Sequence, residues 1–343
     1  MKKVLIGLAV LIFLALSAAG VVYFYAQGEL DKQIPANKDV ILKIPRNSSL
    51  PKIINILNDK GIYQPGWMYE GIAKFYSKLN DKHIQAGYYK FPHYLTNRQL
   101  LDALFAGEYL YTVSVTFPEG LRMRDFASIA AKNLEVDSAE FMQICRTHPI
   151  IDEWGISAGN LEGYLLPDTY RFFPDADARA VVDRFVDAQK KFWTNERMAI
   201  ASANDMTRHE IITLASIVEA EASVPDERRR ISGVYHNRLD RGMLLQADPT
   251  VQFAIGEKRR VLYRDLEARH PYNTYVNSGL PPGPINNPGR SSILATLNPE
   301  QHDYLFFVAV GDGTGWHNFS RNMSGHAENV TEYRRNVRER RSN

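Results

Sequence analysis

The longest hydrophobic pattern stands at the beginning of the chain, where residues 4–26 form a run without a charged side chain. About 20 apolar residues in a helix are enough to cross the hydrocarbon layer of a membrane, so this run predicts a transmembrane helix. Two lysines precede it within residues 1–3, and Glu29 and Asp31 follow it. Because basic residues tend to stay on the cytoplasmic side, residues 1–3 are predicted to be cytoplasmic and the rest of the chain to lie outside the cytoplasm.

A cleaved signal peptide would give a similar pattern, since residues 16–19 supply the small side chains of a cleavage site. The apolar character nevertheless continues through residues 21–25, which end in three aromatic side chains typical of a membrane interface. The sequence therefore favours a retained single-pass anchor, and cleavage remains the alternative.

Beyond this helix the hydrophobic periodicity predicts an α+β fold. Residues 27–39 are polar without a strong period and predict a linker. Within residues 40–110, alternation at 40–45 and 86–91 predicts strands, and capping-box spacing at 96–99 predicts the start of a helix. This small βα module resembles the LysM-type modules that hold glycans, and the same pattern serves equally well as a plain packing unit.

Residues 111–334 predict a larger, mixed α+β domain in which helical periodicity dominates from about residue 136. The three glycines of residues 311–315 lack the strand-to-helix context of a dinucleotide site and predict a hairpin turn. The arginine-rich residues 335–343 predict a solvated basic tail, to which we assign no role.

Composition narrows the chemistry. Lys and Arg total 41 against 39 Asp and Glu, a net charge of +2, so no global field favours a nucleic acid. Cys145 is the single cysteine, which excludes an intramolecular disulfide framework and a cysteine-rich zinc site. Residues 209–213 begin like the zinc motif HExxH but have threonine in place of the second histidine. We therefore expect no metal, no cofactor and no nucleic acid.

The most informative segment is residues 207–221, where Thr207 and Glu210 form a capping box ahead of an apolar run. At 100° per residue, Glu219 aligns with the predicted buried stripe, whereas Glu221 points about 200° away. Burial disfavours the charged form of a carboxyl, so Glu219 is a candidate proton donor. The helix pattern equally allows Glu219 to form a buried ion pair with an arginine such as Arg228 or Arg238.

Downstream of this helix lie a potential helix start and a long loop. Asp248 before Pro249 has a strong structural interpretation as an N-cap followed by proline at the first helical position. The loop at 272–289 is rich in Asn, Tyr, Gly and Pro, whose hydrogen-bonding groups and flat faces suit sugars. A purely structural, turn-rich loop is the alternative.

Besides the predicted anchor, the chain contains several distinctive motifs: FPEG at 117–120, LEGYLLPDTY at 161–170, LASIVE at 214–219, NRL at 237–239, LQADPT at 245–250, YNTY at 272–275 and GLPP at 279–282. Together they resemble the YceG-like family of endolytic murein transglycosylases. The resemblance covers most of the chain. It implies a LysM-like module before a catalytic domain, cleavage within nascent peptidoglycan strands, and a catalytic glutamate that maps to Glu219.

The resemblance also implies the reaction. Protonated Glu219 would donate to the oxygen that joins N-acetylmuramic acid to N-acetylglucosamine, and would then take the proton of the C6 hydroxyl that closes a 1,6-anhydro ring. One carboxyl would serve twice, so the paired acids of most glycosidases are not needed. Gln246, Asn273 and Tyr275 are candidates for holding the sugar, with Asp248 a weaker one, and Glu221 is interpreted as a supporting or surface residue.

The implied setting is the inner (cytoplasmic) membrane, with the catalytic domain on its periplasmic or extracytoplasmic side. The implied partners are peptidoglycan glycan strands and peptidoglycan synthases (penicillin-binding proteins), with glycan termination as the outcome. Two alternatives remain at this point. One is a muramidase that uses water, and the other is a non-catalytic peptidoglycan-binding or division-scaffold protein.

Overall fold

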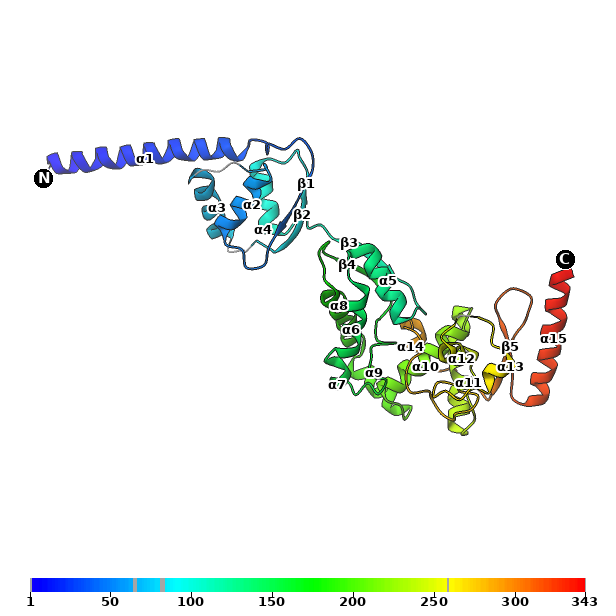
Figure 1. The fold of residues 1–343 in the computed structure, drawn as a ribbon. Coiled ribbons are helices and arrows are strands. Elements are labelled where there is room, and N and C mark those ends of the chain that lie inside the picture. Colours follow the sequence, from blue (N-terminus) through cyan, green and yellow to red (C-terminus); the bar gives the residue numbers. More distant parts are fainter. Residues whose placement is uncertain (1, 64–66, 81–83, 258, 343) are drawn as a thin grey trace. The chain divides into compact units, whose positions relative to one another are not determined.

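The computed structural model describes residues 2–63, 67–80, 84–257 and 259–342 (Figure 1). It divides into two compact units, Met1–Val113 and Ser114–Asn343. Both contain helices and short strands, so the chain has the mixed α+β character that the sequence predicts. The boundary between the units falls three residues after residue 110, the predicted end of the first module.

The N-terminal unit consists of a long helix followed by a small α+β module. Its elements are α1 (Lys2–Leu30), β1 (Val40–Ile44), α2 (Leu50–Asp59), α3 (Trp67–Asn80), β2 (Gly87–Phe91) and α4 (Asn97–Ala106). Strands β1 and β2 pair antiparallel, with Val40 opposite Phe91. Within α1, Ile6–Leu30 is long and apolar enough to cross a membrane by length and composition.

Residues 27–39, predicted as a polar linker, contribute two buried residues to the core of the module. Leu30 and Ile34 are both buried in the core of the module, and the Ile34 amide donates to the Leu95 carbonyl at 2.9 Å. The sequence pattern did not indicate the burial of Leu30 and Ile34, because they are isolated apolar positions in a segment that is otherwise polar.

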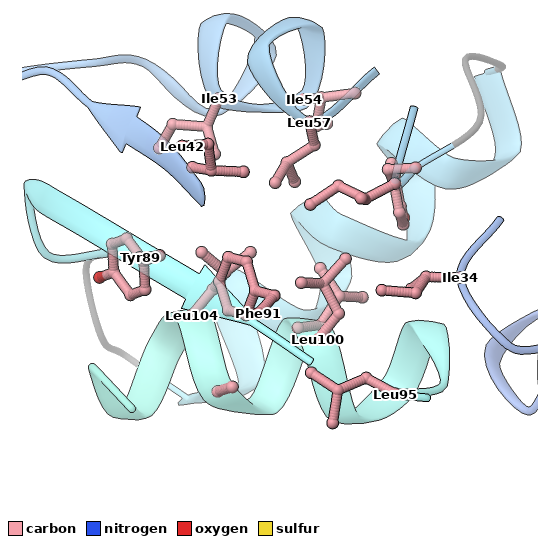
Figure 2. Packing of buried hydrophobic residues seen from close by; sticks show 14 of the residues in the cluster. Ile34, Leu42, Ile53, Ile54, Leu57, Tyr89, Phe91, Leu95, Leu100 and Leu104 are labelled. Atoms are coloured by element: carbon pink, nitrogen blue, oxygen red, sulfur yellow. The ribbon is translucent and has the colours of Figure 1, made fainter. Parts of the chain in front are cut away.

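The core of this module lies between α2, the two strands and α4, as Figure 2 shows. Leu42 of β1, Leu57 of α2 and Leu100 of α4 are buried there. The predicted capping box of α4 is present, since the Thr96 side chain accepts from the Gln99 amide and Gln99 accepts from Thr96. Gly107 ends the helix at a left-handed φ of 71°, which glycine adopts without strain.

The C-terminal unit is mainly helical, with short two-stranded sheets. Its elements are β3 (Val113–Phe117), α5 (Met123–Leu134), α6 (Ser138–Thr147), α7 (Ile150–Glu153), β4 (Asp168–Phe172), α8 (Ala178–Phe192), α9 (Asn195–Ala203), α10 (Arg208–Glu221), the 3-10 helix η1 (Pro225–Glu227), α11 (Arg228–Asp240), α12 (Asp248–Ile255), α13 (Tyr263–Leu266), α14 (Arg290–Leu297), β5 (Phe306–Ala309), β6 (His317–Ser320) and α15 (Met323–Ser342). Strand β3 pairs with β4, and β5 with β6.

Helix α10 is the centre of this unit and carries the candidate glutamates at its end. It begins with the predicted capping box of Thr207 and Glu210. Helices α9, α11, α12 and α14 all contact it (Figure 1), and every residue from Ile211 to Val218 is buried. A helix that is apolar on all sides is a buried helix, so the assumption of one buried stripe was wrong here. Both Glu219 and Glu221 emerge among packed elements.

The C-terminal end of the chain is helical. Residues 335–342, expected to be a solvated tail, are not buried, and they belong to α15, which contacts β5 and β6. The Asn336 side chain donates to the Val310 carbonyl at 2.8 Å. The glycine-rich turn ahead of β6 does connect an antiparallel hairpin, as its sequence predicts.

Candidate active site

Glu219 is held by polar groups on the side of α10 that faces α14. Its Oε2 accepts hydrogen bonds from the Ser292 hydroxyl at 2.6 Å and from the Gly289 amide at 3.1 Å. Its Oε1 lies 3.6 Å from a guanidinium nitrogen of Arg228, and the two side chains are only 8% and 15% exposed. The structure thus contains the arginine ion pair that the sequence left open, with Arg228 and not with Arg238.

A second carboxylate completes this arrangement. The same nitrogen of Arg228 lies 3.7 Å from Glu119 Oε2, so the arginine stands between two acids. Burial and the charge of Glu219 raise the pKa of Glu119, and Arg228 opposes that rise. A Cβ at Gly289 would lie 2.0 Å from the carboxyl carbon of Glu119. A side chain at this position would therefore displace the carboxyl group of Glu119.

Glu221, two residues later, faces a different environment. Its Oε1 accepts a hydrogen bond from the Tyr235 hydroxyl at 3.2 Å. Burial, reinforced by the charge of Asp248, raises the pKa of Glu221 to about 7, while Tyr235 and Arg238 act in the opposite direction. Glu221, interpreted from the sequence as a supporting or surface residue, is half-buried, because other parts of the C-terminal unit surround the end of α10.

Glu221 lines a cavity of about 340 Å³. Its other lining residues come from α11, from the Leu245–Asp248 and Tyr272–Tyr275 segments, from the β5–β6 hairpin and from α15; they are Tyr235, Arg238, Gln246, Asp248, Tyr275, Phe307, Val308, Ala309, His317 and His326. Three of the four residues that the sequence proposes for holding a sugar are among them. The structure brings these three together with Glu221, and Glu219 does not line this cavity.

Gln246, Asp248 and Tyr275 are fixed by local structure. Gln246 has a positive φ of 50°, a strained conformation for a non-glycine residue and one that recurs at functional sites. The Tyr275 hydroxyl donates to Asp248 Oδ1 at 2.6 Å. The N-cap of α12 is Ala247, and Asp248 is the first helical residue. The predicted capping role of Asp248 is therefore wrong, and its carboxylate faces Tyr275 instead.

Asn273 does not contact this cavity. It is 0% exposed, and its side-chain nitrogen donates to the carbonyls of Leu266 and Ala268 at 2.9 and 2.8 Å. Its side-chain oxygen accepts from the Tyr275 amide at 2.9 Å. The prediction that Asn273 holds sugar is corrected, because its hydrogen-bonding groups serve the loop that places Tyr275.

Sequence reasoning missed Tyr235, Arg238, His317 and His326 as lining residues. Arg238 lies within the NRL motif and donates to the carbonyls of Leu245 and Leu305 at 2.5 and 2.7 Å. His317 lies two residues after the glycine-rich turn, between Trp316 and the aromatic residue Phe319, and this position could have been noted in the sequence. For Tyr235 and His326 no sequence signal stands out, because the chain brings them in from separate helices.

The two carboxyls differ in what they can do chemically. Both carboxylate oxygens of Glu219 already contact Ser292, Gly289 or Arg228. A carboxyl with a pKa of about 7 can both donate and accept a proton near neutral pH. Only Glu221 also faces open space together with sugar-compatible side chains. Among the described residues, no group of three or more His, Cys, Asp or Glu could hold a metal ion.

Known proteins similar to this chain agree on one family. A family model described as the YceG-like family matches residues 42–332. The endolytic murein transglycosylase of Bacillus subtilis is 32% identical over 86% of this chain and 85% of that protein. The Streptococcus pneumoniae D39 protein of the same name is 28% identical over 94% of this chain, which spans 64% of its length. A crystal structure of a YceG-like protein from Listeria monocytogenes matches 85% of this chain and 99% of its own, at 32% identity and a TM-score of 0.58. With a family model matching most of its length, this chain belongs to the YceG-like family.

Proposed function

We propose that this chain is an endolytic murein transglycosylase, a peptidoglycan lyase, and that Glu221 is its catalytic residue. The observation that carries the proposal is the cavity in which Glu221, with its pKa raised to about 7, meets Gln246, Asp248 and Tyr275. The names of the similar proteins supply the reaction class. The substrate is the glycan strand of peptidoglycan.

The reaction needs one carboxyl that changes its protonation state. Protonated Glu221 donates its proton to the oxygen between N-acetylmuramic acid and N-acetylglucosamine, and positive charge develops at C1 of the muramic sugar. The 2-acetamido group of that sugar assists at C1. Ionised Glu221, with the Tyr235 hydroxyl donating to its Oε1, then takes the proton of the C6 hydroxyl as this oxygen bonds to C1. The products are an N-acetylglucosamine end and a 1,6-anhydro end.

This assignment moves the catalytic role by two residues from the one that the family resemblance implied. A catalytic role of Glu219 stays a prediction from the sequence. Its hydrogen bonds with Ser292 and Gly289 and its ion pair with Arg228 favour a positioning role instead. In that role Glu219 fixes the end of α10 against the start of α14. The direction of the Glu221 side chain depends on this fixed helix end.

The N-terminal unit supports a proposal on location. We place α1 in the cytoplasmic membrane as a single-pass anchor, with the N-terminus in the cytoplasm, because its apolar length and the two lysines at its beginning fit that orientation. The β1–α2 turn at residues 46–49 lines a cavity of about 540 Å³. This cavity supports a LysM-like role in holding glycan. A role in ending strand growth beside peptidoglycan synthases follows from such an anchored position.

The test uses the full-length protein in detergent with un-crosslinked glycan strands. The wild-type protein should release fragments with anhydro ends, which are lighter by one water than reducing ends in a mass spectrum. Glu221→Gln should abolish release while the thermal unfolding curve stays the same, and Glu219→Gln is the matched control. Reducing ends would indicate a muramidase that uses water. Absence of any release by the wild type would favour a non-catalytic binding or scaffold protein, and full activity of Glu221→Gln would reject the assignment.

A further inference from the structure

A buried carboxylate–histidine pair lies at the edge of the Glu221 cavity. Glu227, the last residue of η1, is 1% exposed, and the side chain of His317 is 10% exposed. Glu227 Oε2 lies 2.8 Å from His317 Nδ1, and Oε1 accepts the His317 backbone amide at 3.0 Å. Both oxygens of one buried carboxylate therefore serve a single histidine.

This pairing fixes which nitrogen of the ring carries a proton. An ionised carboxylate only accepts hydrogen bonds, so Nδ1 of His317 must donate, and in the neutral ring Nε2 then presents a lone pair. Nε2 makes no hydrogen bond with any residue that the structure describes. It is also not among the buried side-chain atoms without a partner in that part of the chain. Nε2 therefore faces open space, and the ring lines the cavity of Glu221.

The Glu227–His317 pair is not needed merely to hold the β5–β6 hairpin against the rest of the unit, because other contacts already do so. A Cβ at Gly315 would already lie 3.2 Å from Ser223, so the turn packs closely against the segment after α10. The His317 ring also lies edge-on to Phe307, with centroids 5.4 Å apart. Burying a carboxylate costs free energy that such apolar contacts avoid. A carboxylate that holds one imidazole tautomer is, in contrast, a recurring device of catalytic and binding sites.

We propose that His317, oriented by Glu227, is a substrate-positioning residue of the Glu221 cavity, whose Nε2 accepts a hydrogen bond from a hydroxyl or amide N–H of the bound glycan. The inference rests on the proposed function, since it assigns His317 to the same cavity. It adds a specific contact from the β5–β6 hairpin, an element that supplies no predicted site residue.

The main test separates the two nitrogens of the ring. In His317→Asn the side-chain amide can still donate to Glu227 but has nothing at the position of Nε2. We expect kcat/KM on un-crosslinked glycan strands to fall about 10- to 100-fold, the effect of losing a hydrogen bond that orients the substrate. The melting temperature should stay within about 2 °C of wild type. His317→Gln, whose longer amide reaches towards the Nε2 position, should restore part of the activity.

A second variant and a control keep the test decisive. Glu227→Gln puts an amide donor in contact with the ring and favours the opposite tautomer, so it should lower kcat/KM as well. The control is His93→Asn, in the N-terminal unit, where Nδ1 also pairs with a carboxylate, Asp39, at 3.2 Å. Wild-type kcat/KM for both His317→Asn and Glu227→Gln, alongside an inactive Glu221→Gln, would overturn the role of His317 and leave the proposed function standing. An active Glu221→Gln would remove the proposed site and this inference with it.

Discussion

Two glutamates that are separated by one residue at the end of α10 lie in opposite chemical environments. Glu219 accepts hydrogen bonds from Ser292 and Gly289 and faces the guanidinium of Arg228. Glu221 accepts one hydrogen bond, from the Tyr235 hydroxyl, and lines a cavity. The first environment engages both carboxylate oxygens of Glu219, whereas burial in the second raises the pKa of Glu221 to about 7. Both residues are glutamates and they have nearly the same neighbours in the sequence. The difference between their environments therefore comes from the elements that pack around the end of α10.

The two environments are also expected to contribute differently to stability and to catalysis. The Glu219 side ties together α10, α11 and α14 through Arg228 and residues 289–292. The Glu221 side gathers residues from the β5–β6 hairpin, α12 and the Tyr272–Tyr275 segment around open space. We therefore expect variants on the first side to change mainly the free energy of unfolding, and variants on the second side to change mainly the rate.

The largest expected effect is on the rate when each glutamate is replaced by glutamine. Glu221→Gln should lower the rate of anhydro-product release by about 10²- to 10⁴-fold, the usual contribution of general acid–base catalysis. Glu219→Gln should stay within about 10-fold of wild type, since it only adjusts the helix end. Initial rates on the same glycan strands measure both. The reverse order of the two effects would return the catalytic role to Glu219.

The next effect concerns stability. Arg228→Met removes the cation from two carboxylates, and breaking a buried ion pair leaves uncompensated charge. We expect the free energy of unfolding to fall by about 3 kcal/mol at neutral pH. Glu221→Gln should not lower it, because a neutral amide removes the cost of burying charge and can still accept from Tyr235. Urea unfolding compares the two variants. An equal loss of unfolding free energy in both would contradict the different roles of the Glu219 side and the Glu221 side.

A smaller effect is expected in the dependence of the rate on pH. In the proposed reaction the acid form of Glu221 donates the first proton, so kcat/KM should decline as the pH rises through the pKa of about 7. Asp248 contributes to the raised pKa through its negative charge. Asp248→Asn should therefore move this decline to lower pH, whatever it does to the maximal rate. A decline that does not move would show that another group titrates.

The same shift gives a stability prediction with a definite sign. Because the pKa of Glu221 is raised above its usual value of 4.5, the folded state binds more protons than the unfolded state between about pH 4.5 and 7. The stabilisation is present below this window and is lost as the pH rises through it. Glu221→Gln should remove that part of the slope in urea unfolding measured from pH 5 to 8, and an unchanged slope would contradict the raised pKa.

The smallest effect should come from the hydroxyl of Tyr275. Tyr275→Phe removes its hydrogen bond to Asp248, and one such bond contributes about 1 kcal/mol, so kcat/KM should fall about 5-fold. Tyr263→Phe is the matched control, because Tyr263 is 90% exposed. If both variants keep the wild-type value, the Tyr275–Asp248 pair does not hold substrate.

Local rules predicted much of the fold. The capping boxes of α4 and α10 were predicted from two residues each and are confirmed, because a cap depends only on a few neighbouring groups. The glycine-rich hairpin turn before β6 is confirmed for the same reason. Leu30 and Ile34 were missed as core residues, since their burial depends on the distant α4 and its preceding turn.

The candidate site shows where local reasoning ends. Asn273 and Tyr275 stand in the same YNTY motif, yet one is fully buried and supports the loop, while the other lines the cavity. Both side chains have sugar-compatible chemistry. Which of them faces the cavity is set by the hydrogen bonds of the loop to residues 266–268, and these follow no short-range pattern.

The sequence by itself determined the helix starts and turns, the apolar N-terminal helix and the motifs of the YceG-like family, because these depend on residues close together in the chain. Only the tertiary structure decided which glutamate at the end of α10 meets an arginine and which meets open space. Helical periodicity gives the direction of a side chain about its own axis. What lies in that direction depends on α11, α14 and the β5–β6 hairpin, which the chain supplies from residues far along the sequence.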